Sequence, residues 1–169
     1  MMKRFLLLLS ISLTLGTGIN ANPIHHLDKL GMGEMKYLFW TLYQAELYTL
    51  NKQSPLTNKS DMALKLIYQK SISSKALIDA TKDQWQSLDY SDKHINLWLE
   101  KLNSILPSVN KQDSLILLLD HQGNSQFFFN LEPIGNIEEP DFGPAFMAIW
   151  LSENTSEPKL RLQLLGIAE

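Results

Sequence analysis

The chain has 169 residues, of which 44% are hydrophobic and 20% charged, with a formal net charge of −3 and no cysteine. The lack of cysteine excludes disulfides, thiolate catalysis and cysteine-ligated metal sites. An acidic chain without a basic stripe argues against nucleic-acid binding, and its length suits a single domain.

The N-terminal segment has the order of a secretory signal peptide. A basic pair, Lys3-Arg4, precedes the apolar run Phe5–Leu15, and small residues follow as far as Ala21. The run is shorter than the roughly 20 residues that a membrane-spanning helix needs. We predict that residues 1–21 are a signal peptide cleaved after about Ala21, leaving residues 22–169 as one periplasmic or secreted domain without a transmembrane span. An uncleaved anchor is the alternative.

The aromatic stretch from Lys36 to Tyr48 predicts a strand or a bent strand pair. Along one regular strand, alternation places apolar side chains on both faces: Tyr37, Phe39, Thr41 and Tyr43 on one, and Leu38, Trp40 and Leu42 on the other. We therefore expect both faces to be covered. One face is expected to form the sheet–helix core, and the other could face a second layer or a ligand cleft, although such a stripe is by default core.

The middle of the chain predicts a loop over Asn51–Asp61, a strand over Met62–Tyr68 and two helices. Ser73 or Ser74 can cap the first helix and Ser91 the second, since apolar residues recur every three or four positions after each.

The last third predicts a hairpin and then two helices. A buried strand over Leu115–Leu119 is followed by a turn and a second strand over Gln126–Leu131. Helical spacing recurs over Phe142–Trp150, and Pro158 opens a final helix that Gly166 can close. The predicted elements thus run from strands to inserted helices, back to strands and on to terminal helices. This order indicates an α+β domain with an antiparallel sheet.

No catalytic, metal or cofactor pattern emerges from the polar residues. The four histidines lack accompanying ligand clusters, and His25-His26 reads as a solvated pair near a fraying terminus. The pair Gly31-x-Gly33 lacks the third glycine of a dinucleotide-binding loop, and no nucleophile elbow is present. We expect no metal and no cofactor.

Several segments, in their order and spacing, resemble the bacterial exported chalcone isomerase-like family. They are Gly31-x-Gly33, Leu38-Phe39-Trp40, Tyr43–Tyr48, Trp85 with Trp98, Leu106-Pro107, Lys111-x-Asp113, Ile134–Phe142 with Phe146, Ile149–Leu151, Thr155–Arg161 and Leu164–Gly166. The resemblance implies an open-faced sandwich, in which a curved antiparallel sheet carries a layer of helices and a cleft lies between them. In plant members this cleft cyclises a chalcone without a cofactor, or binds a fatty acid through an Arg and a Tyr.

The family pattern places this Arg two residues after Gly-x-Gly, where Met35 stands here. Lys36 follows one position later and reaches the same face only if the strand register shifts. Tyr43 and Tyr48 take the tyrosine places. The resemblance thus implies Met35, Trp40, Tyr43 and Tyr48 as ligand-binding residues, and leaves Lys36 and Tyr43 as catalytic candidates. It also makes the aromatic stretch the floor of the cleft, with part of it, notably Trp40, in the core and part, notably Tyr43, lining the ligand space.

Three functions remain open from the sequence. The first is a non-catalytic protein that binds a small apolar or amphipathic ligand, such as a fatty acid, in the sheet–helix cleft. The second is a cofactor-independent intramolecular lyase with Lys36 or Arg161 as its cation and Tyr43 as its donor. The third is a structural or partner-binding protein with a filled cleft. A cavity beside Tyr43 would separate the third from the other two.

Overall fold

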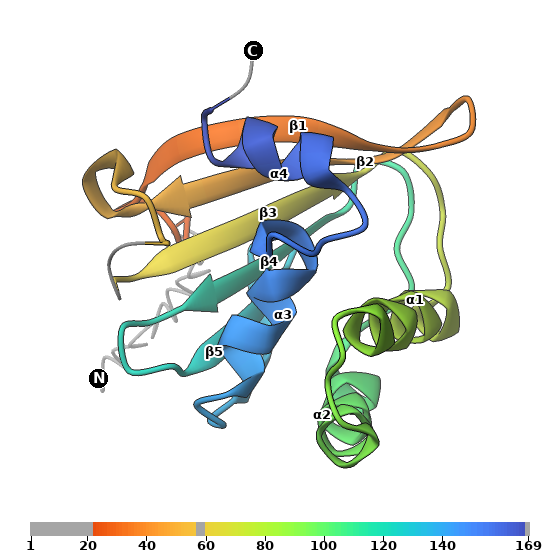
Figure 1. Cartoon of the computed structure of the whole chain (residues 1–169). Coiled ribbons are helices and arrows are strands. Elements are labelled where there is room, and N and C mark those ends of the chain that lie inside the picture. Colours follow the sequence, from red (N-terminus) through yellow and green to blue (C-terminus); the bar gives the residue numbers. More distant parts are fainter. Residues whose placement is uncertain (1–21, 57–59, 168–169) are drawn as a thin grey trace, which may run out of the picture.

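The computed structural model describes residues 22–56 and 60–167 (Figure 1). The predicted signal peptide lies outside the described residues. The strands form one antiparallel sheet in chain order: β1 (Asp28–Tyr37), β2 (Trp40–Thr49), β3 (Met62–Tyr68), β4 (Ser114–Leu119), β5 (Ser125–Phe129) and β6 (Glu132–Ile137). The helices are η1 (Leu50–Lys52, a 3-10 turn), α1 (Ser74–Ser87), α2 (Asp92–Ile105), α3 (Phe142–Leu151) and α4 (Pro158–Leu164).

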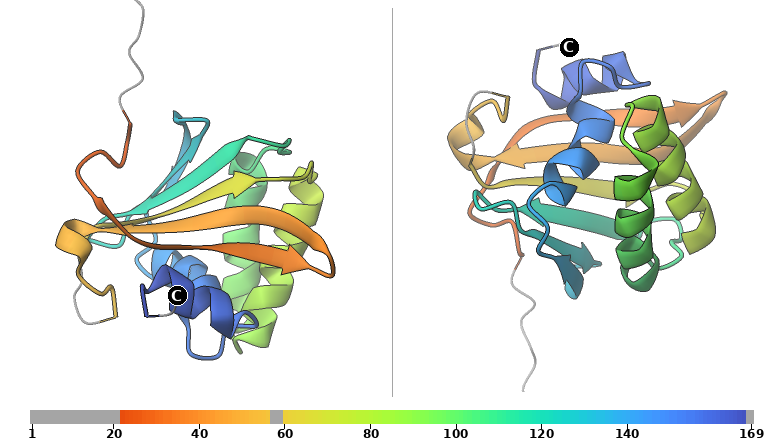
Figure 2. Two further views of the ribbon diagram at one scale, coloured as in Figure 1. Left: turned by 90° about the horizontal axis from the view of Figure 1, so that it is seen from above. Right: turned by 60° about the horizontal axis from the view of Figure 1, so that its bottom comes forward.

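Helices α1 to α4 lie on one face of the curved sheet, which confirms the predicted α+β open-faced sandwich (Figure 2). Among the described residues, no helix combines the length and the apolarity that crossing a membrane requires. The predicted serine caps form, since the Ser73 side chain accepts from the Ala76 amide at 3.2 Å and Ser91 from that of His94 at 3.4 Å.

The core lies between the sheet and the helices, and α3 is its centre. Trp85 of α1 is fully buried, and its indole Nε1 donates to the Ala145 carbonyl of α3 at 2.9 Å. Its ring lies 5.1 Å from that of Trp98 on α2, between ring centroids. Aromatic packing of this kind joins three helices to one another before they meet the sheet.

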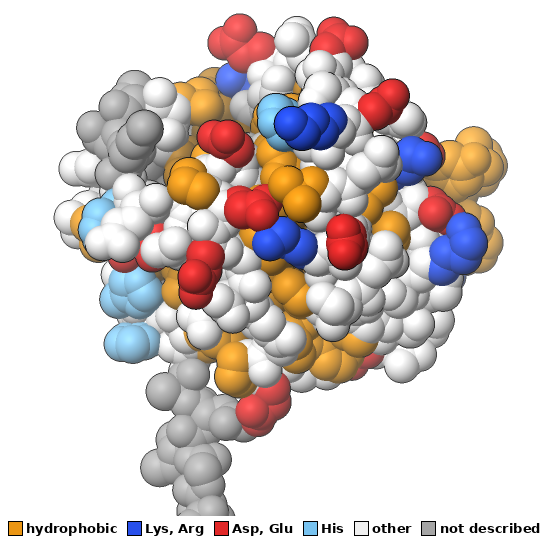
Figure 3. Space-filling view, turned by 90° about the horizontal axis from the view of Figure 1, so that it is seen from below, with side chains coloured by type: hydrophobic (Ala, Val, Ile, Leu, Met, Phe, Trp, Pro, Cys, Tyr) orange, Lys and Arg blue, Asp and Glu red, His pale blue; other side chains and the backbone are white. Residues whose placement is uncertain are grey.

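The stretch Lys36–Tyr48 forms the bent pair rather than one strand, because the chain turns between β1 and β2. Leu38 has a positive φ of 53°, as a two-residue hairpin turn requires. The tip of the hairpin projects beyond the sheet, and Tyr37, Leu38, Phe39 and Trp40 are 64%, 76%, 96% and 59% exposed (Figures 1 and 3). The expectation that both faces are covered is therefore wrong at the tip.

Trp40 is not a core residue, contrary to its sequence assignment. Its exposed ring carries the Lys70 ammonium 4.0 Å from the ring centroid, a cation–π contact at the surface.

The outer face of the sheet is covered in part by the chain that precedes β1. Ile24 and Leu27, which are 2% and 7% exposed, form a small second core with Ala63, Ile116 and Phe128. The prediction of a fraying terminus is wrong for this segment, although the side chains of His25 and His26 are exposed.

Candidate functional site

A cavity of about 240 Å³ lies beside Tyr43, between the sheet and helices α1 and α3. The space predicted to hold a ligand is thus not fully packed by side chains. Its walls are mostly apolar: Met35, Leu42, Tyr43, Leu66, Tyr68, Ile72, Ala76, Leu77, Ala80, Thr81, Gln84, Leu106, Leu115, Phe146, Ile149, Trp150, Ser156 and Glu157. The volume is slightly below the roughly 300–1,000 Å³ that is usual for small-molecule sites.

Tyr43 is fixed by a hydrogen bond across the two layers. Its hydroxyl oxygen accepts from the Trp150 indole Nε1 at 3.0 Å, which joins β2 to α3. The Tyr43 and Tyr68 rings meet edge to face with centroids 5.9 Å apart. Burial raises the pKa of Tyr43, the Trp150 hydrogen bond lowers it and the negative charge of Glu157 raises it, and together they set the pKa at about 12. Burial also raises the pKa of Tyr68. Both phenols therefore keep their protons near neutral pH.

Met35 meets Tyr43 as predicted, because the two residues are partners in the β1–β2 ladder and line the same cavity. The register does shift between Met35 and Lys36. Lys36 nevertheless lies outside this cavity, with its ammonium 3.0 Å from the Glu34 carboxylate and its side chain 62% exposed. The shift has not brought Lys36 to the position of the family's Arg.

Arg161 does not reach the cavity either. Its guanidinium Nε donates to the Leu151 carbonyl at 2.8 Å, at the C-terminal end of α3. Among the described residues that line the cavity, none is Lys, Arg or His. The cation that the lyase alternative assigns to Lys36 or Arg161 is thus missing from the space beside Tyr43.

Trp40 and Tyr48, which the resemblance assigns to ligand binding, do not line the cavity. Trp40 lies at the hairpin tip. Tyr48 lies on the outer face of the sheet, where its hydroxyl donates to the buried Glu46 carboxylate at 2.8 Å. Side chains alternate between the two faces along a strand, and Tyr43 and Tyr48 are an odd number of positions apart on β2. They therefore point to opposite faces of the sheet.

Among the residues that line this cavity and carry polar groups, the sequence reasoning gave no site role to Tyr68, Trp150 or Glu157. Tyr68 ends a predicted strand and Trp150 lies on a predicted helix, so each had a place in the core but no role. The β2–β3 register pairs Tyr68 with Tyr43, and the packing of α3 against β2 brings Trp150 to it.

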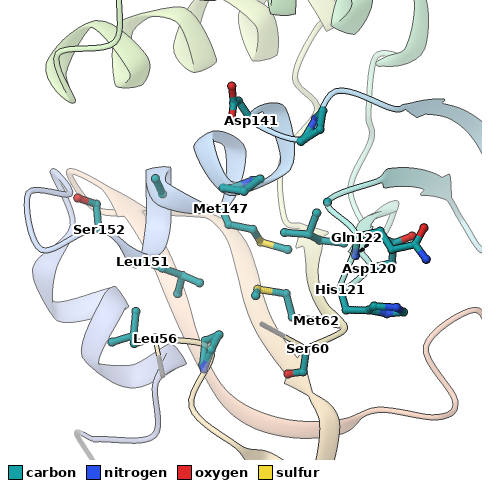
Figure 4. A pocket seen from close by; sticks show the side chains of 16 residues that line it. Leu56, Ser60, Met62, Asp120, His121, Gln122, Asp141, Met147, Leu151 and Ser152 are labelled. Atoms are coloured by element: carbon teal, nitrogen blue, oxygen red, sulfur yellow. Dashed lines mark hydrogen bonds between the residues drawn. The ribbon is translucent and has the colours of Figure 1, made fainter. Parts of the chain in front are cut away.

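A larger hollow of about 590 Å³ lies between α3 and the ends of β3 and β4 (Figure 4). Several of its polar groups pair within the protein: Asp120 accepts from the amides of Gln122 and Asn124, and His121 Nδ1 lies 2.9 Å from Asp61. Nowhere in residues 22–56 and 60–167 do three or more potential metal ligands gather. The hollow is therefore a weaker candidate site than the cavity beside Tyr43.

An antiparallel sheet with helices on one face and an apolar cavity between the layers defines an open-faced α+β sandwich. The chain belongs to the chalcone isomerase-like family, whose model matches residues 23–166. A fatty-acid binding protein of Arabidopsis thaliana has a similar structure, with a TM-score of 0.66 and 12% identity over 84% of this chain and 88% of that one. An uncharacterized protein of Haemophilus influenzae is 25% identical over 158 residues, which are 93% of this chain and 77% of the relative.

Proposed function

We propose that this protein binds a small apolar or amphipathic molecule with a single alkyl chain in the cavity beside Tyr43, and that it does so without catalysis. The observation that carries the proposal is the cavity itself, whose walls are mostly aliphatic and aromatic with a few polar groups near Tyr43. Sites of this composition suit ligands that water dissolves poorly.

Two further observations support it. The plant protein with a similar fold is a fatty-acid binding protein, so this sandwich can hold an acyl chain in at least one instance. Among the described residues that line the cavity, none offers Tyr43 a cation, whereas stabilising a phenolate and an enolate would need one. Both observations favour binding without turnover. The signal-peptide pattern of residues 1–21 supports a periplasmic or secreted place of action.

The test begins with protein purified from the periplasm of its own host and examined by native mass spectrometry. A copurified small molecule is expected, and a clean apo mass together with no binding of added lipid would count against the proposal. Turnover of a chalcone above the uncatalysed rate, abolished by Tyr43→Phe, would instead support the lyase.

A matched pair of variants on α1 locates the binding. Ala80 lines the cavity at its exposed rim, whereas the exposed Lys82 of the same helix does not line it. Ala80→Phe should weaken the binding of decanol by about tenfold or more, a loss of about 1.4 kcal/mol. Lys82→Phe introduces the same ring outside the cavity and should leave the affinity unchanged. Equal affinities in the two variants would place the site elsewhere.

A further inference from the structure

Tyr68 brings a phenol to the wall of the cavity. The residue is 2% exposed and lines the cavity, and its hydroxyl makes no hydrogen bond to any described residue. Buried hydroxyls in folded proteins are nearly always paired with protein, water or ligand. Thr49 Oγ1 and Ser125 Oγ are the fully enclosed side-chain atoms without a partner among the described residues, so the Tyr68 hydroxyl still touches open space and is a donor available to whatever fills the cavity.

Tyr43 adds a second donor to the same space. Its oxygen accepts the Trp150 hydrogen bond at 3.0 Å, and a phenol has one proton of its own to give. That proton is donated to no described group. The other hydroxyls of the cavity are committed, since Thr81 donates to the Leu77 carbonyl at 2.8 Å and Ser156 to the Gln84 side chain at 2.8 Å.

The charges around these two donors select the kind of acceptor. The cavity lining contains no cationic side chain among the described residues, but it contains the Glu157 carboxylate. In a mostly apolar space, an anionic head group would lose its hydration without gaining a counter-ion and would also be repelled by Glu157. An uncharged oxygen has neither disadvantage.

We infer that the head group bound beside Tyr43 and Tyr68 is an uncharged oxygen acceptor, such as a fatty alcohol or a fatty ester, rather than a fatty-acid carboxylate. The Tyr68 hydroxyl, with that of Tyr43, donates to the acceptor oxygen, and the alkyl chain lies against the aliphatic wall formed by Leu66, Leu77 and Leu115. The inference rests on the proposed function and specifies the ligand class for that same cavity.

The test compares decanol, methyl decanoate and decanoate at neutral pH, each displacing the uncharged dye Nile red from the mature protein. Decanol and methyl decanoate are expected to bind about tenfold or more tightly than decanoate. Equal or tighter binding of decanoate would overturn the inference and leave the proposed function standing. If neither the dye nor any of the three ligands binds, both are overturned.

Two variants assign the effect to the named groups. Glu157→Gln removes the repelling charge and should strengthen the binding of decanoate several-fold while leaving decanol nearly unchanged. Tyr68→Phe should weaken the binding of decanol several-fold, because it removes the donor and keeps the ring. If Tyr68→Phe does not fold, as judged by its thermal melt, Tyr43→Phe provides the same comparison. An unchanged preference between decanol and decanoate in Glu157→Gln and in the tyrosine variant would overturn the inference.

Discussion

Met35 occupies the position of the arginine that the resemblance leads one to expect, and it is the residue at which this chain departs most from a carboxylate-binding site. Its side chain is half-buried, lines the cavity and is the ladder partner of Tyr43. An apolar thioether here agrees with the absence of a cation from the described lining. Position 35 is therefore the place where a substitution could supply the cation that the family pattern has.

We predict that Met35→Arg will raise the affinity for decanoate. A charge-assisted hydrogen bond to a desolvated carboxylate is worth roughly 1.5–3 kcal/mol, which corresponds to about tenfold or more. Calorimetric titration of the variant and of Met35→Leu as a control measures the change. The new Arg can also pair with Glu157 of the same cavity, so the gain should be larger when Glu157→Gln is added.

A contrary outcome for Met35→Arg is equally definite. If Met35 packs in a closed core in solution, an unpaired buried cation will destabilise the fold by several kcal/mol. The melting temperature would then fall steeply and decanoate would not restore it. That result would remove Met35 from the ligand site.

The buried phenols predict that the protein loses stability at alkaline pH. Burial raises the pKa of Tyr43 to about 12, whereas a phenol in the unfolded chain ionises near pH 10. Below about pH 10 both states hold the proton, and above it the unfolded state loses the proton first, so stability falls as pH rises from about 10 toward 12. Urea denaturation across this range should show the fall, and Tyr43→Phe should make it shallower. An identical slope in the variant would contradict the burial of this hydroxyl.

Among the elements, the β1–β2 hairpin departs most from the sequence expectation. Its apolar tip is exposed, while the same two strands carry Met35 and Tyr43 into the cavity a few residues away. We predict that Phe39→Ser, at a side chain 96% exposed, changes the free energy of unfolding by no more than about 0.5 kcal/mol. Phe127→Ala, at a fully buried ring, should cost about 3–5 kcal/mol in the same urea experiment. Comparable losses would mean that the tip is packed in solution.

The contact of α4 with β1 depends on glycine. A Cβ built on Gly31 would lie 2.2 Å from the Gln163 carbonyl oxygen and 2.4 Å from that of Leu164, both in the backbone of α4. The motif Gly31-x-Gly33 therefore permits close packing of a helix on an edge strand. This packing accounts for the glycine without a phosphate-binding role. We predict that Gly31→Ala destabilises the protein by about 1–3 kcal/mol, measured by thermal melting. Glu34→Ala, on the exposed side of the same strand, is the control and should have little effect.

At the scale of the whole molecule, we predict where the mature chain begins. Asn22 opens the turn that places Ile24 on the outer face, since its side-chain oxygen accepts from the Ile24 amide at 3.2 Å. Cleavage after about Ala21 would leave this turn intact. N-terminal sequencing of the periplasmic fraction should begin at or near Asn22, and intact Met1 in a membrane pellet would contradict export with cleavage.

The sequence by itself determined the α+β class, most of the strands and all four α-helices, because these depend on local periodicity and capping. The serine caps at Ser73 and Ser91 and the apolar spacing of α3 are examples. It missed β6 and most of β1, the two edge strands, where Gly and Pro weaken the pattern and the sheet tolerates them.

Only the tertiary structure decided which aromatic side chains form the site. Tyr43 and Trp150 are 107 residues apart in the chain and join through one hydrogen bond, while Trp40, three residues from Tyr43, lies exposed at a hairpin tip. Tyr48 faces the outer side of the sheet, and Tyr68 and Glu157 enter the cavity. The physical reason is that composition states how apolar a side chain is, whereas its burial depends on which distant element packs over it.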